Sequence, residues 1–439
     1  MKRNVALICC IVLVLSMFTA CAKQEAPAKV EAEPETAAAS DVIELTMWYP
    51  HQWEALDNWF DMKIEEFNKL YEGKYHLSWE SIVRSDSFGY EDKLSAGITS
   101  NSLPDIVGID GPTLSSYAAN GILRPIDDLV SEEEVNDFFD ATIQQCTYDG
   151  KLFGLCPAES SVAIYYNVDM LNSIGARIPE SYNDAWTWSE YYEIAKQLTT
   201  DTCKGATLII DKGEGLTYGL QPFWVSNGTD IISEDGTTAD GYINSEKGIE
   251  AATYLQKFFV EGIANIDPIA GEFGNGNSAT WLGGCWEAAG LEANYPDLNW
   301  DVTYYPVADG GTPVSPTGDW LFSITNNCKN PEAAMAVISF FCSAENCVSF
   351  CGKDYYGQPA ARKSSLELMT EYNEEPYSLF KEQLFETGHA RPRTPVYPTL
   401  TSKFVEGMLD IFTGADVKET LDNVAKIVDE EYQSLYAGN

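Results

Sequence analysis

The sequence predicts an α/β fold in which open, mostly parallel sheets are flanked by helices. From Val42 onward, apolar residues recur first at alternate positions and then at helical spacing. A β-α-β-α-β order of this kind is typical of parallel strands joined by crossover helices. The chain has 439 residues, of which 45% are hydrophobic, so it is long and apolar enough for about two to three domains with sizeable cores.

The N-terminus has the pattern of an export signal. Two basic residues precede an apolar run from Val5 to Ala20, which is shorter than the ~20 residues that span a bilayer but typical of a signal-peptide core. The run ends in Phe18-Thr19-Ala20-Cys21, which resembles the lipobox of bacterial lipoproteins, with Phe where Leu is usual. We therefore expect residues 1–20 to be a signal peptide and Cys21 to carry acyl chains such as palmitate. An ordinary secretory signal is the alternative.

Residues 21–41 are predicted to form a tether. They are mostly Ala, Glu, Pro, Lys and Thr with almost no large apolar side chain, so burial cannot offset their ordering entropy. A lipidated cysteine, a flexible acidic arm and a globular body describe a bacterial protein on the extracellular side of the cell membrane. It would contact that membrane through its lipid anchor only.

The globular part begins with the alternation that predicts the fold. Apolar residues alternate in a strand from Ile43 to Met47, and a helix with apolar side chains from Leu56 to Tyr71 follows. A second strand is expected over residues 76–83, a polar helix over 90–98 and a short apolar strand over 106–109.

Two later helices begin with capping patterns. Asn330-Pro331-Glu332 places a capping residue before a proline at the first helical position, ahead of a helix over residues 333–341. Asp416 and Glu419 have the spacing of a capping box at the start of the last helix.

The charge balance excludes several partners. With 27 Lys and Arg against 67 Asp and Glu, the formal net charge is −40 at pH 7. Such a surface repels the phosphates of nucleic acids and anionic lipid head groups. We therefore expect no nucleic-acid partner, and we expect the acidic residues to be mainly a solvated surface.

Sequence motifs for catalysis or metal binding are missing. The chain has three His and no GxSxG, GxxxxGK[ST] or HExxH, and the Gly-rich Gly274–Asn277 lacks the Lys of a phosphate loop. Eight of the 11 cysteines remain after the signal and Cys21; none forms a CxxC pair, so no zinc site is expected. These eight either form disulfides or stay reduced. We expect no metal and no cofactor.

Two predicted strand ends carry the residue types of a binding site. In open α/β sheets, ligands bind beyond the carboxyl ends of the strands. Aromatic faces there can pack on the C–H face of a sugar, while carboxylates and amides bind its hydroxyls. The ligand-binding residues predicted in this way are Trp48, Tyr49, His51, Gln52, Glu54 and Asp110.

Eight segments, in order along the chain, resemble motifs of the extracellular solute-binding protein family 1, the group of maltose-binding protein and other sugar-binding lipoproteins of ABC transporters. Asn330–Ala334, for example, matches N-P-E-A-A, and Leu103–Val107 resembles the PDI/PDV strand. The others are Gly121–Leu129, Tyr148–Pro157, Ile164–Leu171, Trp186–Leu198, Phe273–Trp286 and Pro359–Arg362. Their shared order, rather than any single motif, identifies the family.

This resemblance implies a two-lobe, type II periplasmic-binding-protein-like fold whose lobes are joined by hinge strands and close on a ligand. It places residues 42–158 and 306–356 in one lobe and residues 159–305 and 357–439 in the other. Gly283-Gly284-Cys285 departs from the family pattern in being unusually small. By similarity, the further ligand-binding residues are Glu159, Trp224, Asn227, Trp286, Asp319, Trp320, Tyr355 and Arg391.

The resemblance also implies the function. We expect a monomeric, lipid-anchored subunit of an ABC importer that captures a mono- or oligosaccharide and delivers it to the transmembrane permease subunits, without catalysis. Three alternatives stay open: the same fold binding a cationic solute such as a polyamine, a secreted carbohydrate-active hydrolase, and a surface adhesin.

Overall fold

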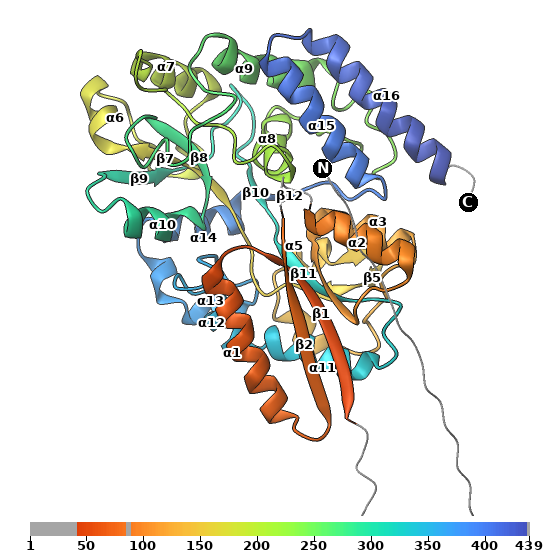
Figure 1. Cartoon of the computed structure of the whole chain (residues 1–439). Helices are drawn as coiled ribbons and strands as arrows, with labels where there is room; N and C mark the ends of the chain where they lie inside the picture. The colour runs from red at the N-terminus through yellow and green to blue at the C-terminus, as the bar shows by residue number, and fades with distance from the viewer. Residues whose placement is uncertain (1–41, 85–88, 437–439) are drawn as a thin grey trace, which may run out of the picture. The chain divides into compact units, whose positions relative to one another are not determined.

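Two separate sheets organise the chain in the computed structural model, which describes residues 42–84 and 89–436 (Figure 1). We call the part built on the first sheet the first lobe and the part built on the second sheet the second lobe. The predicted signal peptide, the lipidated Cys21 and the tether lie outside the described residues.

The first sheet contains the predicted N-terminal strands. Its strand order is β2-β1-β3-β11-β6, with β1 parallel to both β2 and β3, and β11 antiparallel to both β3 and β6. The expected alternation of strands and helices is confirmed here. The strands of this sheet and the first two helices are β1 (Ile43–His51), α1 (Glu54–Leu70), β2 (Tyr75–Val83), α2 (Gly89–Ser100), β3 (Ile106–Asp110), β6 (Gly154–Leu155) and β11 (Trp320–Ile324).

Both sheets correct the prediction of mostly parallel strands: the first is mixed, and the second is antiparallel throughout. The strand order of the second sheet is β8-β7-β9, and both pairings are antiparallel, between β7 (Val162–Asn167), β8 (Thr280–Gly284) and β9 (Trp300–Thr303). More than one hundred residues separate β7 from β8, so the direction of pairing is set by the long-range path of the chain and not by a β-α-β unit. One parallel bridge, between Thr207 and Trp281, adjoins β8.

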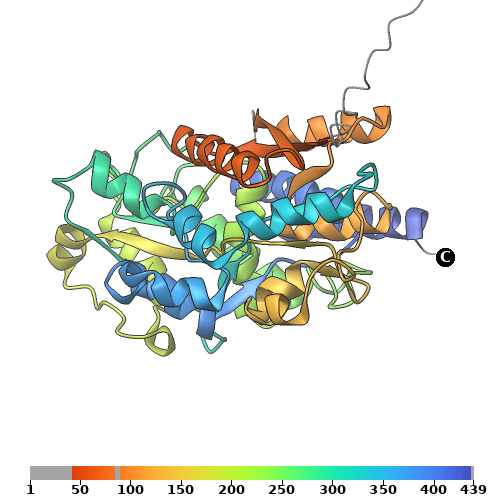
Figure 2. The same cartoon turned by 90° about the horizontal axis from the view of Figure 1, so that it is seen from below.

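Helices flank both sheets, and α15 and α16 run side by side in the second lobe (Figures 1 and 2). The helices not yet given are α3 (Leu114–Ala119), α4 (Glu132–Asn136), α5 (Asp140–Gln145), α6 (Val168–Ile174), α7 (Trp188–Leu198), α8 (Glu214–Ser226), α9 (Glu246–Val260), α10 (Glu287–Asn294), α11 (Pro331–Phe341), α12 (Ala344–Cys351), α13 (Lys363–Leu368), α14 (Tyr377–Glu386), α15 (Tyr397–Phe412) and α16 (Val417–Tyr436). The short strands are β4 (Thr147–Tyr148), β5 (Lys151–Leu152), β10 (Ser315–Thr317) and β12 (Gly388–Ala390).

Several helix starts follow from local sequence. Pro331 occupies the first turn of α11, as predicted, but the Asn330 side chain makes no capping hydrogen bond there. Asp416 caps α16, because its carboxylate accepts from the Glu419 backbone N–H at 2.9 Å. Thr187 begins α7 with a reciprocal capping box to Glu190.

Each lobe has its own aromatic core. In the first lobe, Trp59 and Phe60 of α1 pack against Phe341 of α11 beneath the sheet. In the second lobe, Trp224 of α8 packs edge-on against Phe404 of α15, with 5.2 Å between ring centroids. Burying a large apolar side chain contributes about 1.5–3 kcal/mol, so these clusters fix the positions of the helices that carry the site.

Segments from distant parts of the sequence lie side by side where the lobes meet. Ala158 pairs with Ala360, Ser161 pairs with Thr317, and β10 runs parallel to β12. The lobe boundaries assigned from the family resemblance stay a prediction, because these contacts do not fix where the chain bends.

The eight cysteines in the described part of the chain are all free thiols, and six of them are buried. Burial raises the pKa of the Cys285 and Cys347 thiols to about 12, so both stay protonated at neutral pH. Of the two possibilities that the sequence left open, the structure has the reduced one.

Within residues 42–84 and 89–436, no single helix is long and apolar enough to cross a membrane. Helices α11 and α12 taken together are long and apolar enough to cross a membrane, but they meet at a bend of 58°. Their apolar residues, such as Val337 and Phe350, are buried in the first core. The same residues contain no group of three or more His, Cys, Asp or Glu arranged to hold a metal ion.

We predict that Trp224→Ala lowers the free energy of unfolding by about 3–5 kcal/mol, because it removes a fully buried indole. The indole also donates to the Ile243 carbonyl at 3.0 Å, and that acceptor would lose its partner. Urea denaturation followed by circular dichroism measures the change. Trp79→Ala, which removes a half-buried indole from the first lobe, is the control and should cost less. Equal costs would contradict the core role of Trp224.

Candidate functional site

A cavity of about 200 Å³ lies where strand ends of the first lobe face helix α8 of the second. Gln52 and Trp53 follow β1, Asp110 ends β3, and Glu214 and Tyr218 project from the first turns of α8. Six of the residues predicted from the sequence line this cavity: Gln52, Asp110, Trp286, Asp319, Trp320 and Arg391.

Aromatic rings form two walls of the cavity. Trp53 and Tyr356 stack with 5.4 Å between ring centroids, and their contact is reinforced by a hydrogen bond from the Trp53 indole N–H to the Tyr355 carbonyl. Tyr218 and Trp286 lie 6.3 Å apart with planes inclined by 31°. Flat apolar faces of this kind suit a ligand that has a flat apolar face of its own.

The run Gly283-Gly284-Cys285 has a structural role in placing Trp286. A Cβ atom on Gly284 would lie 2.2 Å from the Trp286 ring, a distance that real Cβ contacts do not reach. Only glycine therefore lets the indole fold back over the end of β8 to border the cavity.

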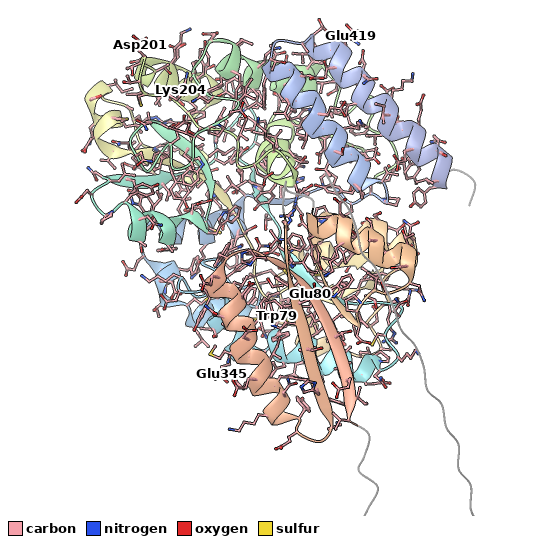
Figure 3. The ribbon with its side chains drawn as sticks, viewed as in Figure 1. Trp79, Glu80, Asp201, Lys204, Glu345 and Glu419 are labelled. Carbon is pink, nitrogen blue, oxygen red and sulfur yellow. The ribbon has the colours of Figure 1, made fainter. Side chains whose placement is uncertain are left out.

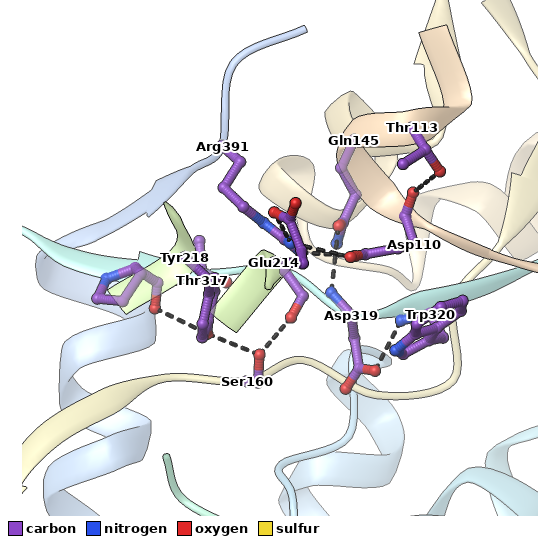
Figure 4. A network of polar contacts seen from close by, with 12 residues as sticks. Asp110, Thr113, Gln145, Ser160, Glu214, Tyr218, Thr317, Asp319, Trp320 and Arg391 are labelled. Atoms are coloured by element: carbon purple, nitrogen blue, oxygen red, sulfur yellow. Dashed lines mark hydrogen bonds and ion pairs between the residues drawn. The ribbon is translucent and has the colours of Figure 1, made fainter. Parts of the chain in front are cut away.

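A buried ion-pair network forms another wall (Figure 4). Arg391 Nη2 donates to Asp110 Oδ1 at 2.6 Å, and Nη1 donates to Asp110 Oδ2 at 2.9 Å and to Glu214 Oε1 at 2.7 Å. All three side chains are less than one-tenth exposed. Because Asp110 belongs to the first lobe and Glu214 to the second, the guanidinium joins the two lobes.

The opposite charges of Arg391 and Glu214 act against the effect of burial on each group. Burial acts to lower the pKa of Arg391, but the charges of Asp110 and Glu214 raise it well above its usual value. Burial raises the pKa of Glu214, and the charge of Arg391 opposes that rise. Tyr397 and Thr401 of α15 also donate to the Glu214 carboxylate. With these partners in place, the carboxylate oxygens of Asp110 and Glu214 have little capacity left to accept hydrogen bonds from a ligand.

Asp319 is the third buried carboxyl of the cavity. It accepts from the Tyr356 hydroxyl and from the Trp320 backbone N–H, each at 2.6 Å. Turned with its nitrogen toward this carboxyl, the Gln358 amide donates to Oδ2, also at 2.6 Å. Burial nevertheless raises the pKa of Asp319 to about 8. At neutral pH the group is therefore mainly protonated.

Some predicted site residues of β1 and its exit do not line the cavity. Tyr49 is buried in the first core. The Lys93 ammonium lies over the Trp48 ring, with 4.6 Å between Nζ and the ring centroid. His51 faces Asp57 with 2.7 Å between Nδ1 and Oδ2, and Glu54 is exposed at the start of α1. Trp48 and Tyr49 lie within β1, where side chains point to the two faces of the sheet rather than beyond its end.

The other four also lie outside the cavity wall. Glu159 is buried beside it and accepts from the Thr142, Gln145 and Thr317 side chains; burial raises its pKa. Trp224 is in the second core. Asn227 donates to the Lys247 carbonyl, and Tyr355 contributes its carbonyl to Trp53.

Several lining residues were not predicted individually. Trp53 lies between Gln52 and Glu54, two residues that the sequence predicts for the site. Glu214 and Tyr218 face the cavity one helical turn apart, but a single sequence gives no sign of which face of α8 meets a ligand. The others include Arg84, Ser160, Asp211, Tyr356 and Gln358.

Comparison with known proteins gives a consistent result. The family model described as bacterial extracellular solute-binding protein matches residues 64–377. The galactooligosaccharide-binding protein of Bacillus subtilis (strain 168) is 21% identical over 353 residues, which cover 76% of this chain and 78% of that protein.

Solved structures show the same fold. An ABC transporter solute-binding protein from Thermotoga lettingae, bound with α-D-tagatose, has a TM-score of 0.76 and 20% identity over 89% of this chain and 100% of its own. The cyclic α-maltosyl-1,6-maltose binding protein from Arthrobacter globiformis has a TM-score of 0.73 and 24% identity over 90% of this chain and 100% of its own. The predicted two-lobe, type II α/β fold is therefore confirmed, except that the first sheet is mixed and the second is antiparallel, rather than both mostly parallel.

We predict that Asp319→Asn removes a pH-dependent loss of stability. Because the folded state raises this pKa from an ordinary value near 4 to about 8, it holds a proton that the unfolded state releases. The free energy of unfolding should therefore fall as pH rises from about 4 to about 8, by an amount on the order of 5 kcal/mol from this group.

Urea denaturation of wild type and variant at several pH values measures the difference. The free energies of unfolding of wild type and variant should be closest near pH 4.5. From there to about pH 8, the stability of the variant should increase relative to that of wild type. Glu345→Gln, which alters an exposed carboxylate on the outer surface (Figure 3), is the control and should run parallel to wild type. Parallel curves for Asp319→Asn would contradict the raised pKa.

Proposed function

Because this chain belongs to the bacterial extracellular solute-binding protein family, we propose that it is the solute-binding subunit of an ABC importer and that its solute is a carbohydrate. The observation that carries the proposal is a cavity that combines aromatic faces with buried polar groups. A sugar has both surfaces, since its ring presents an apolar C–H face and its hydroxyls lie around the rim.

Two residues that line the cavity each carry a buried donor without a hydrogen-bond partner. Within the described residues, these donors are Gln52 Nε2 and Arg391 Nε. A buried donor left unpaired costs about 1–3 kcal/mol, and a ligand hydroxyl placed beside it would recover that free energy. Trp53 and Trp286 would supply the apolar contacts.

The relatives support a sugar rather than another solute class. The Bacillus subtilis protein is a galactooligosaccharide-binding protein, and the two solved structures concern tagatose and a cyclic maltosyl-maltose. Their identities to this chain are low, so the argument for this chain rests on the chemistry of the cavity.

Capture would proceed by binding and closure without catalysis. The ligand would meet one lobe first, and contacts from the other lobe would favour the closed state that the permease recognises. We propose that the protein is a monomer. One moving lobe consists of residues 42–158 and 306–356, and the remaining body is the other lobe. The hydrogen-bonded segments around Ala158, Thr317 and Ala360 would then be the hinge.

A cationic solute is the second candidate, and the acidic residues of the cavity are the observation in its favour. Arg391 compensates Asp110 and Glu214, however, and Asp319 is mainly protonated at neutral pH. Asp211 uses Oδ1 to accept from the backbone N–H groups of Gly213 and Gly215. The field at the cavity is therefore weaker than the acid count suggests, and it favours a neutral solute.

We predict that Trp286→Ala weakens binding of the cognate sugar at least tenfold, or about 1.4 kcal/mol, because it removes a stacking face. Titration calorimetry against a panel of mono- and oligosaccharides, with polyamines included, first identifies the ligand and then measures the change. Trp300→Ala removes an indole of β9 that does not border the cavity, and it should bind as wild type does. Saturable heat with a polyamine and none with any sugar would reject the carbohydrate.

We further propose that Cys21 is the lipidated N-terminus and that residues 21–41 tether the body outside the cell. Replacement of Cys21 by Ala should abolish labelling by a palmitate analogue and move the protein from the membrane fraction to the medium. Cys10→Ala, within the predicted signal, is the control and should leave both unchanged. Labelling that persists in the Cys21 variant would reject this anchor.

A further inference from the structure

A larger hollow adjoins the cavity on the far side of the ion-pair network. This groove, of about 620 Å³, is lined by residues of α2, α3 and α15, including Ser95, Tyr117 and Thr401. Asp110 and Glu214 border both the groove and the cavity. Arg391 borders only the cavity and bonds both carboxylates, so the three side chains form the wall between the two spaces.

This wall is held rigidly. The Arg391 guanidinium lies 4.8 Å from the centroid of the Tyr218 ring on one side. On another, a Cβ atom at Gly318 would lie 3.3 Å from Nη2, and Gly318 has a φ of +137°, a conformation that disfavours other residues. A sugar chain could pass this wall only by separating a buried, hydrogen-bonded ion pair, which is strongly unfavourable.

The cavity is also bounded toward the second lobe. A hollow of about 390 Å³ there shares only Ile210 with the cavity. Ile210 packs closely on the glycines of α8, since Cβ atoms on Gly215 and Gly219 would approach it within 3.1 and 3.0 Å. An apolar side chain fixed in this way offers no hydrogen bonds to a second sugar ring.

We propose that the Asp110–Arg391–Glu214 network sets the length of the ligand and restricts it to a short saccharide of roughly one or two units. The cavity, at about 200 Å³, is below the ~300–1,000 Å³ typical of sites for drug-sized ligands, whereas cavity and groove joined would fall within that range. This inference rests on the proposed function. It goes beyond family membership, since the relatives named above concern ligands from a monosaccharide to oligosaccharides.

The first test is the affinity of the wild-type protein for maltose-series and galactose-series saccharides of one to six units, by titration calorimetry. The tightest binding should fall at one or two units, and affinity should drop at least tenfold by four. Equal or tighter binding of the longer chains would overturn the length limit while leaving the carbohydrate function intact. Failure of every saccharide to bind would instead reject the proposed function, and the length limit with it.

The second test opens the wall. The triple variant Asp110→Asn, Glu214→Gln, Arg391→Ala removes the side chain that spans the gap without leaving an unpaired buried charge. The ratio of the affinity for a tetrasaccharide to the affinity for a disaccharide should be at least tenfold higher than in the wild-type protein. Arg362→Ala is the matched control, because it breaks a part-buried ion pair with Asp137 that lies outside the cavity; it should cost stability and leave the ratio unchanged.

Thermal unfolding is measured for each variant, and Arg391→Lys decides the question if the triple variant does not fold. Arg391→Lys keeps the charge but cannot bond both carboxylates as a planar fork, so it provides a milder opening. Its affinity ratio should rise at least threefold. An unchanged ratio in this folded variant would overturn the role of the network in setting the length of the ligand.

Discussion

One guanidinium joins the two lobes, and the geometry of the cavity depends on it. Arg391 binds a carboxylate from the end of β3 and another from the start of α8, all three nearly free of solvent. Burying charges is costly, and such a network is no more stabilising than a well-packed apolar one. Its directionality is what distinguishes it: the hydrogen bonds fix where α8 stands relative to the first sheet, and hence where Tyr218 meets Trp286.

Parts of this arrangement could be predicted from the sequence because they depend on local patterns. Asp110 was found because it ends a short apolar strand, and Trp286 because it lies in a motif with a fixed spacing. Glu214 was missed, since nothing in a single sequence tells which face of α8 meets the other lobe. The antiparallel pairing of β7 with β8 was missed for a similar reason, because segments far apart in the chain determine it.

The large negative net charge of the chain comes mainly from residues outside the site. Acidic side chains such as Glu80, Asp201 and Glu419 are exposed on the outer surface (Figure 3). Among the described residues only Asp110, Glu159, Glu214, Glu272 and Asp319 are buried acids. The buried acids at the cavity are compensated by Arg391 or, in the case of Asp319, mainly neutralised by protonation. The acidity of the chain therefore describes its surface rather than the chemistry of its ligand.

The free thiols have a consequence for how the chain matures. None of the eight described cysteines is committed to a covalent link, so the body gains no cross-linking entropy and relies on non-covalent contacts alone. Folding after export would then need no oxidant and no isomerase to sort pairings. A body built in this way reaches the same native state in aerated and in oxygen-free surroundings, and six of its thiols are shielded from reagents in either.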